Sequence, residues 1–139
     1  AIGACFANPG RPVFAIVGDG GFQMTMPELA TVKRYQVPVK IVLIDNRNLG
    51  MVRQWQELFY DERYSATNLS DNPDFCTIAS AYDIEAFRIS GPEDAPSTLQ
   101  AFLAYTGPAL LHVLCYPDEL VWPMIPAGGV VEDLMESKA

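Results

Sequence analysis

Short, almost entirely apolar segments alternate along the chain with helix-like segments, and this alternation restricts the fold more than any other feature. The apolar segments lack a regular exchange of polar and apolar residues, which is typical of strands buried on both faces in a parallel sheet. Three segments have this character, and "IEAFRI" (84–89) is a weaker fourth. The three are "VFAIV" (13–17), "VKIVLI" (39–44) and "ALLHVLC" (109–115). We therefore predict four strands at these positions.

Four stretches between and around these strands are predicted helices: 25–36, 50–64, 72–83 and 93–107. Thr25 and Glu28 form a capping-box pattern with Pro27 in the first turn. Asn72 is the predicted cap of a later helix, with Pro73 at its first position. The predicted order is β-α-β-α-α-β-α-β. This order favours an α/β fold: an open parallel sheet with flanking helices and right-handed crossovers.

The two ends of the chain differ from this core. Residues 1–10, "AIGACFANPG", read as the end of a helix closed by "NPG", and they include no initiator methionine. We therefore expect the domain to be truncated at its N-terminus. Beyond Pro117 the chain is rich in proline and glycine, and "GGVVEDLMES" suggests a last short helix. The expected organisation is one partial domain at 1–117 followed by a C-terminal tail at 118–139.

The charge of the chain limits its partners. The 139 residues have a formal net charge of −8, and half of them are hydrophobic. This balance argues against nonspecific binding to nucleic acid or to an anionic membrane. An anionic ligand would need a local cation, either a side-chain cluster or a metal ion. No run of about 20 apolar residues is present, so we predict no membrane span.

The cysteines and the histidine do not form a pattern typical of a zinc site or of a catalytic site. Cys5, Cys76 and Cys115 are far apart and form no C-x-x-C pair. We interpret them as reduced core thiols of a cytoplasmic protein rather than as zinc ligands. His112 is the single histidine and lies within an apolar strand. A packed core residue is the favoured interpretation, and a catalytic role is the alternative.

The turn after the first strand places an acid among glycines, "GDGG" at 18–21. Glycine-rich turns between a strand and a helix usually bring backbone N–H groups close to phosphate, which Asp19 would repel. A second turn, "DNRNLG" (45–50), follows the next strand. Ligands of open α/β sheets bind at the carboxyl ends of the strands. We therefore expect both turns to line one site.

A metal ion would resolve the conflict between an acid and a phosphate. Asp19 offers a carboxylate oxygen, Asn46 an amide oxygen and Asn48 a backbone carbonyl. Mg²⁺ prefers such oxygen donors and keeps positions for water and phosphate. A cation held there would bridge Asp19 to a diphosphate, and Gly50 would allow a second close backbone approach. "GDG" alone is also consistent with an ordinary tight turn, so the prediction depends on the two turns together.

These motifs resemble the signature of thiamine-diphosphate enzymes, in which GDG is followed one crossover later by a pair of asparagines. Asp45 stands where the first asparagine is usual, while Asn46 matches the member that binds metal in that family. The stretch "NLGMVRQWQELFYDERYS", together with "DNPDF" and "VWPMIP", is similar to the large, catalytic subunit of acetolactate synthase. The "DN" variant resembles isozyme II of that enzyme.

The resemblance implies roles for particular residues. The implied contacts to thiamine diphosphate come from Gly18, Asp19, Gly20, Gly21, Asn46, Asn48, Gly50 and Met51. The implied Mg²⁺ ligands are Asp19, the side chain of Asn46 and the main chain of Asn48. Met51 and Trp55 would line the substrate channel, although ordinary helix packing explains their four-residue spacing equally well. Glu28 is better explained as a cap than as a catalyst, and Arg53 as a solvated charge or as a contact to a substrate carboxylate.

The resemblance also implies a reaction and partners. Pyruvate would condense with a second 2-keto acid, pyruvate or 2-ketobutyrate, with loss of CO₂. The complete enzyme would also bind FAD, form a homo-oligomer with its active site between subunits, and possess a regulatory small subunit. The glutamate that activates the cofactor would lie outside this chain, so no catalytic residue is predicted here. The alternatives are a pyruvate oxidase, a glyoxylate carboligase, and a noncatalytic fragment or interaction module.

Overall fold

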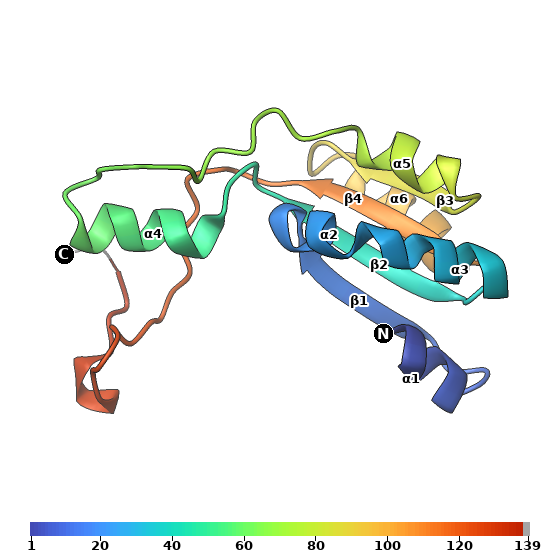
Figure 1. Cartoon of the computed structure of the whole chain (residues 1–139), viewed down its shortest axis with the longest axis horizontal. Helices are drawn as coiled ribbons and strands as arrows, with labels where there is room; N and C mark the ends of the chain where they lie inside the picture. Colours follow the sequence, from blue (N-terminus) through green and yellow to red (C-terminus); the bar gives the residue numbers. More distant parts are fainter. Residues whose placement is uncertain (138–139) are drawn as a thin grey trace.

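A four-stranded parallel sheet forms the centre of the molecule (Figure 1). The structure is a computed structural model and describes residues 1–137. The strands lie in the order β1-β2-β4-β3. Their bounds are β1 Val13–Gly18, β2 Val39–Asp45, β3 Glu85–Ile89 and β4 Ala109–Leu114. The four predicted strands and the open parallel sheet are thus confirmed.

Helices cover the two faces of the sheet unequally. The larger apolar core lies between the sheet and α2 (Asp19–Thr25), α3 (Leu29–Tyr35) and α5 (Phe75–Ala81), and α1 (Ile2–Ala7) also contributes to it. Phe22 of α2 and Phe75 of α5 meet edge to face within this core. On the opposite face, α6 (Ala95–Ala104) places Phe102 in a smaller core with residues of β3 and β4. The sheet and its flanking helices therefore form the expected layered α/β arrangement.

The edge strand β1 departs from the prediction that every strand is buried on both faces. Its residues alternate in burial, and the side chains of Phe14 and Ile16 are 44% and 77% exposed. The central strands β2 and β4 are largely buried. The difference arises because the smaller core around α6 is centred on β3 and β4. On β1 it reaches Phe14, whose ring lies 6.5 Å from that of Phe102, and it leaves Ile16 exposed.

Two predicted helix caps are wrong. The first crossover helix begins at Asp19, directly after β1, and continues through a 3-10 turn, η1 (Met26–Glu28), into α3. Thr25 therefore lies inside the helical segment, where its hydroxyl donates to carbonyls of the preceding turn rather than acting as a cap. The helix α5 is capped by Asp74, whose carboxylate accepts from the Thr77 N–H at 2.9 Å, and Asn72 lies outside it.

The other predicted helices are present with shorter bounds. The helix α4 spans Gly50–Phe59, and α6 ends at Ala104, before Gly107. The predicted last helix is a single 3-10 turn, η2 (Val131–Asp133). Cys5 is buried, whereas Cys115 is exposed, so the core interpretation is wrong for Cys115. Within the described residues, no helix is both long and apolar enough to cross a membrane.

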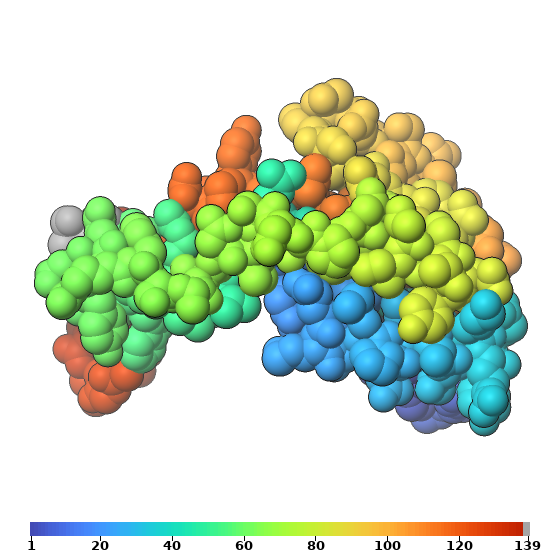
Figure 2. Space-filling view, turned by 45° about the horizontal axis from the view of Figure 1, so that its top comes forward, coloured from blue at the N-terminus to red at the C-terminus, as the bar shows by residue number. Residues whose placement is uncertain are grey.

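The helix α4 lies beside the sheet and packs against the C-terminal tail (Figure 1). Gln54 is buried in this contact: its amide accepts from the Val121 N–H at 2.8 Å and donates to the Val121 carbonyl at 3.0 Å. Arg53 pairs with Asp118 at 2.7 Å. Figure 2 shows the segment after α4 running along the surface from α4 back to α5. The tail and this segment thus hold α4 beside the carboxyl ends of the strands.

Candidate functional site

The two glycine-containing turns meet at one edge of the sheet. Because β1 and β2 are parallel neighbours with Gly18 opposite Ile44, Asp19, which follows β1, lies next to Asp45, the last residue of β2. A cavity of about 380 Å³ lies at this edge. All eight residues predicted to contact the cofactor line it: Gly18, Asp19, Gly20, Gly21, Asn46, Asn48, Gly50 and Met51. The topology therefore brings together every residue of that set.

Two of the glycines lie so close to neighbouring side chains that a Cβ atom would force those side chains to move. A Cβ atom on Gly20 would lie 2.6 Å from the Leu49 Cδ2 atom. A Cβ atom on Gly50 would lie 2.8 Å from the Asn46 Nδ2 atom. Both distances are shorter than real Cβ contacts, so a larger residue at either position would displace the side chain of Leu49 or Asn46. These glycines allow the loop after β2 to pack closely on the start of α2 and on itself.

The loop after β2 forms a tight turn around Asn46. The Asn48 N–H donates to the Asn46 Oδ1 atom, and the Asn48 amide donates back to the Asn46 carbonyl, both at 3.1 Å. Between them, Arg47 has a left-handed backbone with φ of 58°. An amide oxygen has two acceptor positions, so Asn46 Oδ1 retains one for a cation. The turn thus holds the Asn46 side chain toward the cavity in a defined orientation.

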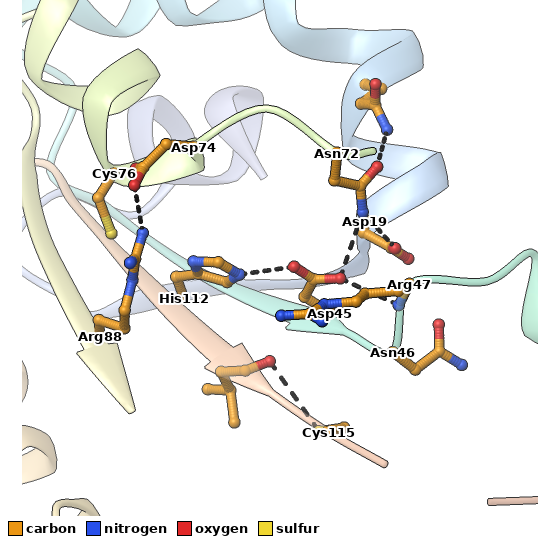
Figure 3. A network of polar contacts seen from close by, with 12 residues as sticks. Asp19, Asp45, Asn46, Arg47, Asn72, Asp74, Cys76, Arg88, His112 and Cys115 are labelled. Carbon is orange, nitrogen blue, oxygen red and sulfur yellow. Dashed lines mark hydrogen bonds and ion pairs between the residues drawn. The ribbon is translucent and has the colours of Figure 1, made fainter. Parts of the chain in front are cut away.

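Two buried acids lie side by side below the cavity (Figure 3). Asp19 and Asp45 are 1% and 3% exposed, respectively. The Asn72 amide donates to Asp19 Oδ2 at 2.7 Å and to Asp45 Oδ1 at 3.3 Å. His112, 4% exposed, places Nε2 2.8 Å from Asp45 Oδ2. His112 is therefore buried as predicted, but it is also the partner of the acid that replaces the usual asparagine.

The surroundings of the two acids shift their pKa values in opposite directions. Burial raises the pKa of Asp19, the hydrogen bond from Asn72 opposes this, and the neighbouring Asp45 raises it further. Burial also acts to raise the pKa of Asp45, but hydrogen bonds from His112 and from other groups outweigh it, and the pKa is lowered. The lower pKa of the pair thus belongs to Asp45 and the higher pKa to Asp19. A cation next to Asp19 would favour its ionised form.

The oxygen donors at this edge are suited to Mg²⁺ rather than to zinc. Among residues 1–137, no group of three or more histidine, cysteine, aspartate or glutamate side chains is arranged to hold a metal. The cavity instead offers the carboxylate of Asp19, the amide oxygen of Asn46 and the backbone of Asn48, and Glu119 is a second acid in its lining. A hard cation that keeps several positions for water or phosphate fits this set.

Met51 and Trp55 line a second cavity, of about 690 Å³, on α4. Its other lining residues are Val52, Gln56, Tyr60 and Arg63. Met51 is shared with the cofactor cavity, whereas Trp55 lines only the second one and meets Phe59 edge to face at 5.7 Å. The packing interpretation thus accounts for part of the Trp55 surface, and the rest faces a cavity that adjoins the first. Arg53 is not a free charge, because it pairs with Glu57 and Asp118.

Comparisons with known proteins agree with this geometry. Residues 1–113 match the family described as thiamine pyrophosphate enzyme, C-terminal TPP binding domain. The chain is 49% identical to the acetolactate synthase isozyme 2 large subunit of Escherichia coli K12, over 98% of this chain and 25% of that protein. It is 46% identical to the acetolactate synthase large subunit of Pyropia yezoensis, over 92% of this chain and 22% of that protein.

A solved structure has the same fold. The thiamine diphosphate-dependent 4-hydroxybenzoylformate decarboxylase of Rhodococcus jostii RHA1 superimposes with a TM-score of 0.77 at 26% identity, over 86% of this chain and 22% of that chain. The chain spans about a quarter of the length of the curated relatives it matches. The predicted resemblance to acetolactate synthase large subunits is confirmed. Since the family match covers most of its length, the chain belongs to the thiamine pyrophosphate enzymes, as their C-terminal TPP-binding domain.

Proposed function

We propose that this chain is the diphosphate- and metal-binding part of an acetolactate synthase catalytic subunit. The complete enzyme would condense pyruvate with a second 2-keto acid, pyruvate or 2-ketobutyrate, with loss of CO₂. The observation that supports this most strongly is the single cavity lined by all eight predicted cofactor residues, with Asp19 among them. Similarity to acetolactate synthase large subunits over nearly the whole chain supports the choice of reaction.

The residues of this chain would hold and orient the cofactor. Asp19, the Asn46 amide oxygen and the Asn48 carbonyl would bind Mg²⁺, and the glycine backbone of 18–21 would lie against the diphosphate. Thiamine diphosphate itself supplies an electron sink for the decarboxylation of a 2-keto acid. Met51 would lie beside the cofactor, and the α4 cavity with Trp55 would receive the second 2-keto acid. The apolar lining there would exclude water from the reacting groups.

Other functional groups would come from outside this chain. We propose that the activating carboxylate, an FAD site and a second subunit complete the enzyme as a homo-oligomer. A regulatory small subunit is a further proposed partner, and the cytoplasm is the proposed location.

Product identification by the full-length catalytic subunit tests this function. With pyruvate, thiamine diphosphate and Mg²⁺ we expect acetolactate, and with 2-ketobutyrate added we expect 2-aceto-2-hydroxybutyrate. Asp19→Ala should abolish both products. Oxidative consumption of pyruvate without acetolactate would indicate a pyruvate oxidase, and carboligation of glyoxylate would indicate a glyoxylate carboligase. Cofactor binding without any turnover would support the noncatalytic alternative.

A further inference from the structure

Asn72 lies at the end of the segment that connects α4 to α5, far along the chain from both glycine-containing turns. Its half-buried side chain does not cap a helix but reaches the acids below the cavity (Figure 3). The Nδ2 atom donates to Asp19 at 2.7 Å and to Asp45 at 3.3 Å, and the Oδ1 atom accepts from Gln23 Nε2 at 2.8 Å. Three partners, two from α2 and one from the end of β2, therefore fix this amide.

Asp45 is fixed from its other side. His112 occupies its Oδ2 atom at 2.8 Å, and the Arg47 N–H donates to its Oδ1 atom at 3.0 Å. Asp45 does not line the cofactor cavity, whereas Asp19 does. Asp45 thus serves as a buried, immobile anion next to Asp19 rather than as a cation ligand.

Two buried carboxylates that accept from the same amide nitrogen are close enough to repel each other when both are ionised. The Asn72 amide is a neutral donor placed between both, so it stabilises their proximity through hydrogen bonds to each charged group. By engaging Asp19 Oδ2, it also sets the orientation of the carboxylate that lines the cavity. Without this donor, the Asp19 carboxylate would keep its backbone hydrogen bond from Gly20 but lose the bond that holds its Oδ2 atom.

We propose that Asn72 is a positioning residue of the metal site, holding the Asp19 carboxylate in the orientation that binds the cation. The inference rests on the proposed function, because it takes Asp19 as a metal ligand. Partners that orient metal ligands typically contribute 10- to 100-fold to metal affinity. We therefore expect Asn72→Ala to weaken Mn²⁺ binding by roughly 10- to 100-fold. At saturating Mn²⁺, turnover should return to within a few-fold of wild type.

The experiment is a Mn²⁺ titration of the full-length subunit, with thiamine diphosphate present and free Mn²⁺ followed by electron paramagnetic resonance. Asn68→Ala is the matched control, since this residue of the same segment bonds only the Ser70 N–H, at 2.7 Å, among the hydrogen bonds described for its side chain. We expect its Mn²⁺ affinity to stay within about twofold of wild type, because it contacts neither acid. Thermal melting of both variants shows whether a loss of Mn²⁺ affinity comes with a loss of stability in the segment between α4 and α5 or occurs in a protein as stable as wild type.

Each outcome decides a different claim. Failure of wild type to bind Mn²⁺ in a cofactor-dependent way would contradict the proposed function itself. Wild-type binding with an unchanged affinity in folded Asn72→Ala would overturn the inference alone. If Asn72→Ala does not fold, Gln23→Met removes the bond that holds the Asn72 oxygen while leaving both acids and Asn72 in place. We expect it to weaken Mn²⁺ binding by about threefold or more, and unchanged affinity would again overturn the inference.

Discussion

Replacing Gly50 with alanine should damage the metal site while leaving the fold nearly intact. The new Cβ atom would lie 2.8 Å from the Asn46 Nδ2 atom, whereas ordinary contacts begin at 3.4 Å. The Asn46 amide must therefore retreat by about half an ångström, which is comparable to the tolerance of a functional site. Because Nδ2 and the proposed ligand Oδ1 belong to one rigid amide, the ligand moves with it.

The expected effects on affinity and stability differ. A displacement of this size should weaken cofactor-dependent Mn²⁺ binding by roughly 10- to 100-fold, or about 1.4–2.7 kcal/mol. Stability should change by less than about 1 kcal/mol, since alanine favours helix formation over glycine and the contacted atom terminates a flexible side chain. The turn bond from the Asn48 N–H to Asn46 would be strained by the same movement.

A Mn²⁺ titration of the full-length subunit with thiamine diphosphate, combined with thermal melting, measures both effects. Gly3→Ala is the control, because Gly3 lies in α1 and a Cβ atom there would meet nothing within 4 Å. The control should bind Mn²⁺ as wild type does and be equally or slightly more stable. Wild-type affinity in folded Gly50→Ala would refute the reasoning that Gly50 is needed to place Asn46.

Three further changes test other parts of the structure. Asp74→Ala should destabilise the domain by about 1 kcal/mol at pH 7, through loss of the α5 cap and of the ion pair with Arg88. The pKa of Asp74 is lowered from 3.8 to about 2, chiefly by the hydrogen bond from the Thr77 N–H. The stabilisation is therefore present above about pH 3.8 and is lost as the pH falls toward 2. Urea unfolding should show that wild type has the higher free energy of unfolding at pH 7 and that this difference disappears in acid. Trp55→Leu should keep activity but change the preference for 2-ketobutyrate over pyruvate by roughly 10- to 100-fold in a competition assay, since one methylene is worth about 1–3 kcal/mol; an unchanged product ratio would leave Trp55 as a packing residue. Gln54→Ala should release the tail from α4 and speed proteolysis there, and an unchanged cleavage rate would show that other contacts hold the tail.

The sheet and the composition of the cofactor cavity could be predicted because both follow from local patterns. Apolar segments separated by crossover helices determine parallel neighbours, and parallel neighbours bring the turns that follow them to the same edge. The sequence alone therefore predicts that Asp19 and Asn46 lie at the same edge of the sheet. The exposed face of β1 could not be foreseen, because the burial of an edge strand depends on where α6 packs.

The contacts between distant residues were missed. Asn72 resembles a helix cap because it precedes Pro73, but Asp74 takes that role by accepting from the Thr77 N–H, and its other carboxylate oxygen pairs with Arg88 of β3. The bond from Asn72 to Asp19 spans 53 residues, and no local pattern indicates it. The partnership of His112 with Asp45 had one available signal: an acid in place of the usual asparagine, in a chain with a single histidine in a neighbouring strand.

The central claim is that Asp19 and Asn46 hold a metal ion that binds the diphosphate of the cofactor. Calorimetric titration of the full-length subunit with thiamine diphosphate, in the presence of Mg²⁺ and then with a chelator, tests it most directly. We expect Mg²⁺-dependent binding to wild type, and no measurable metal-dependent binding to folded Asp19→Ala or Asn46→Ala. Near-normal affinity in either variant, or equal binding with and without Mg²⁺ in wild type, would contradict the account.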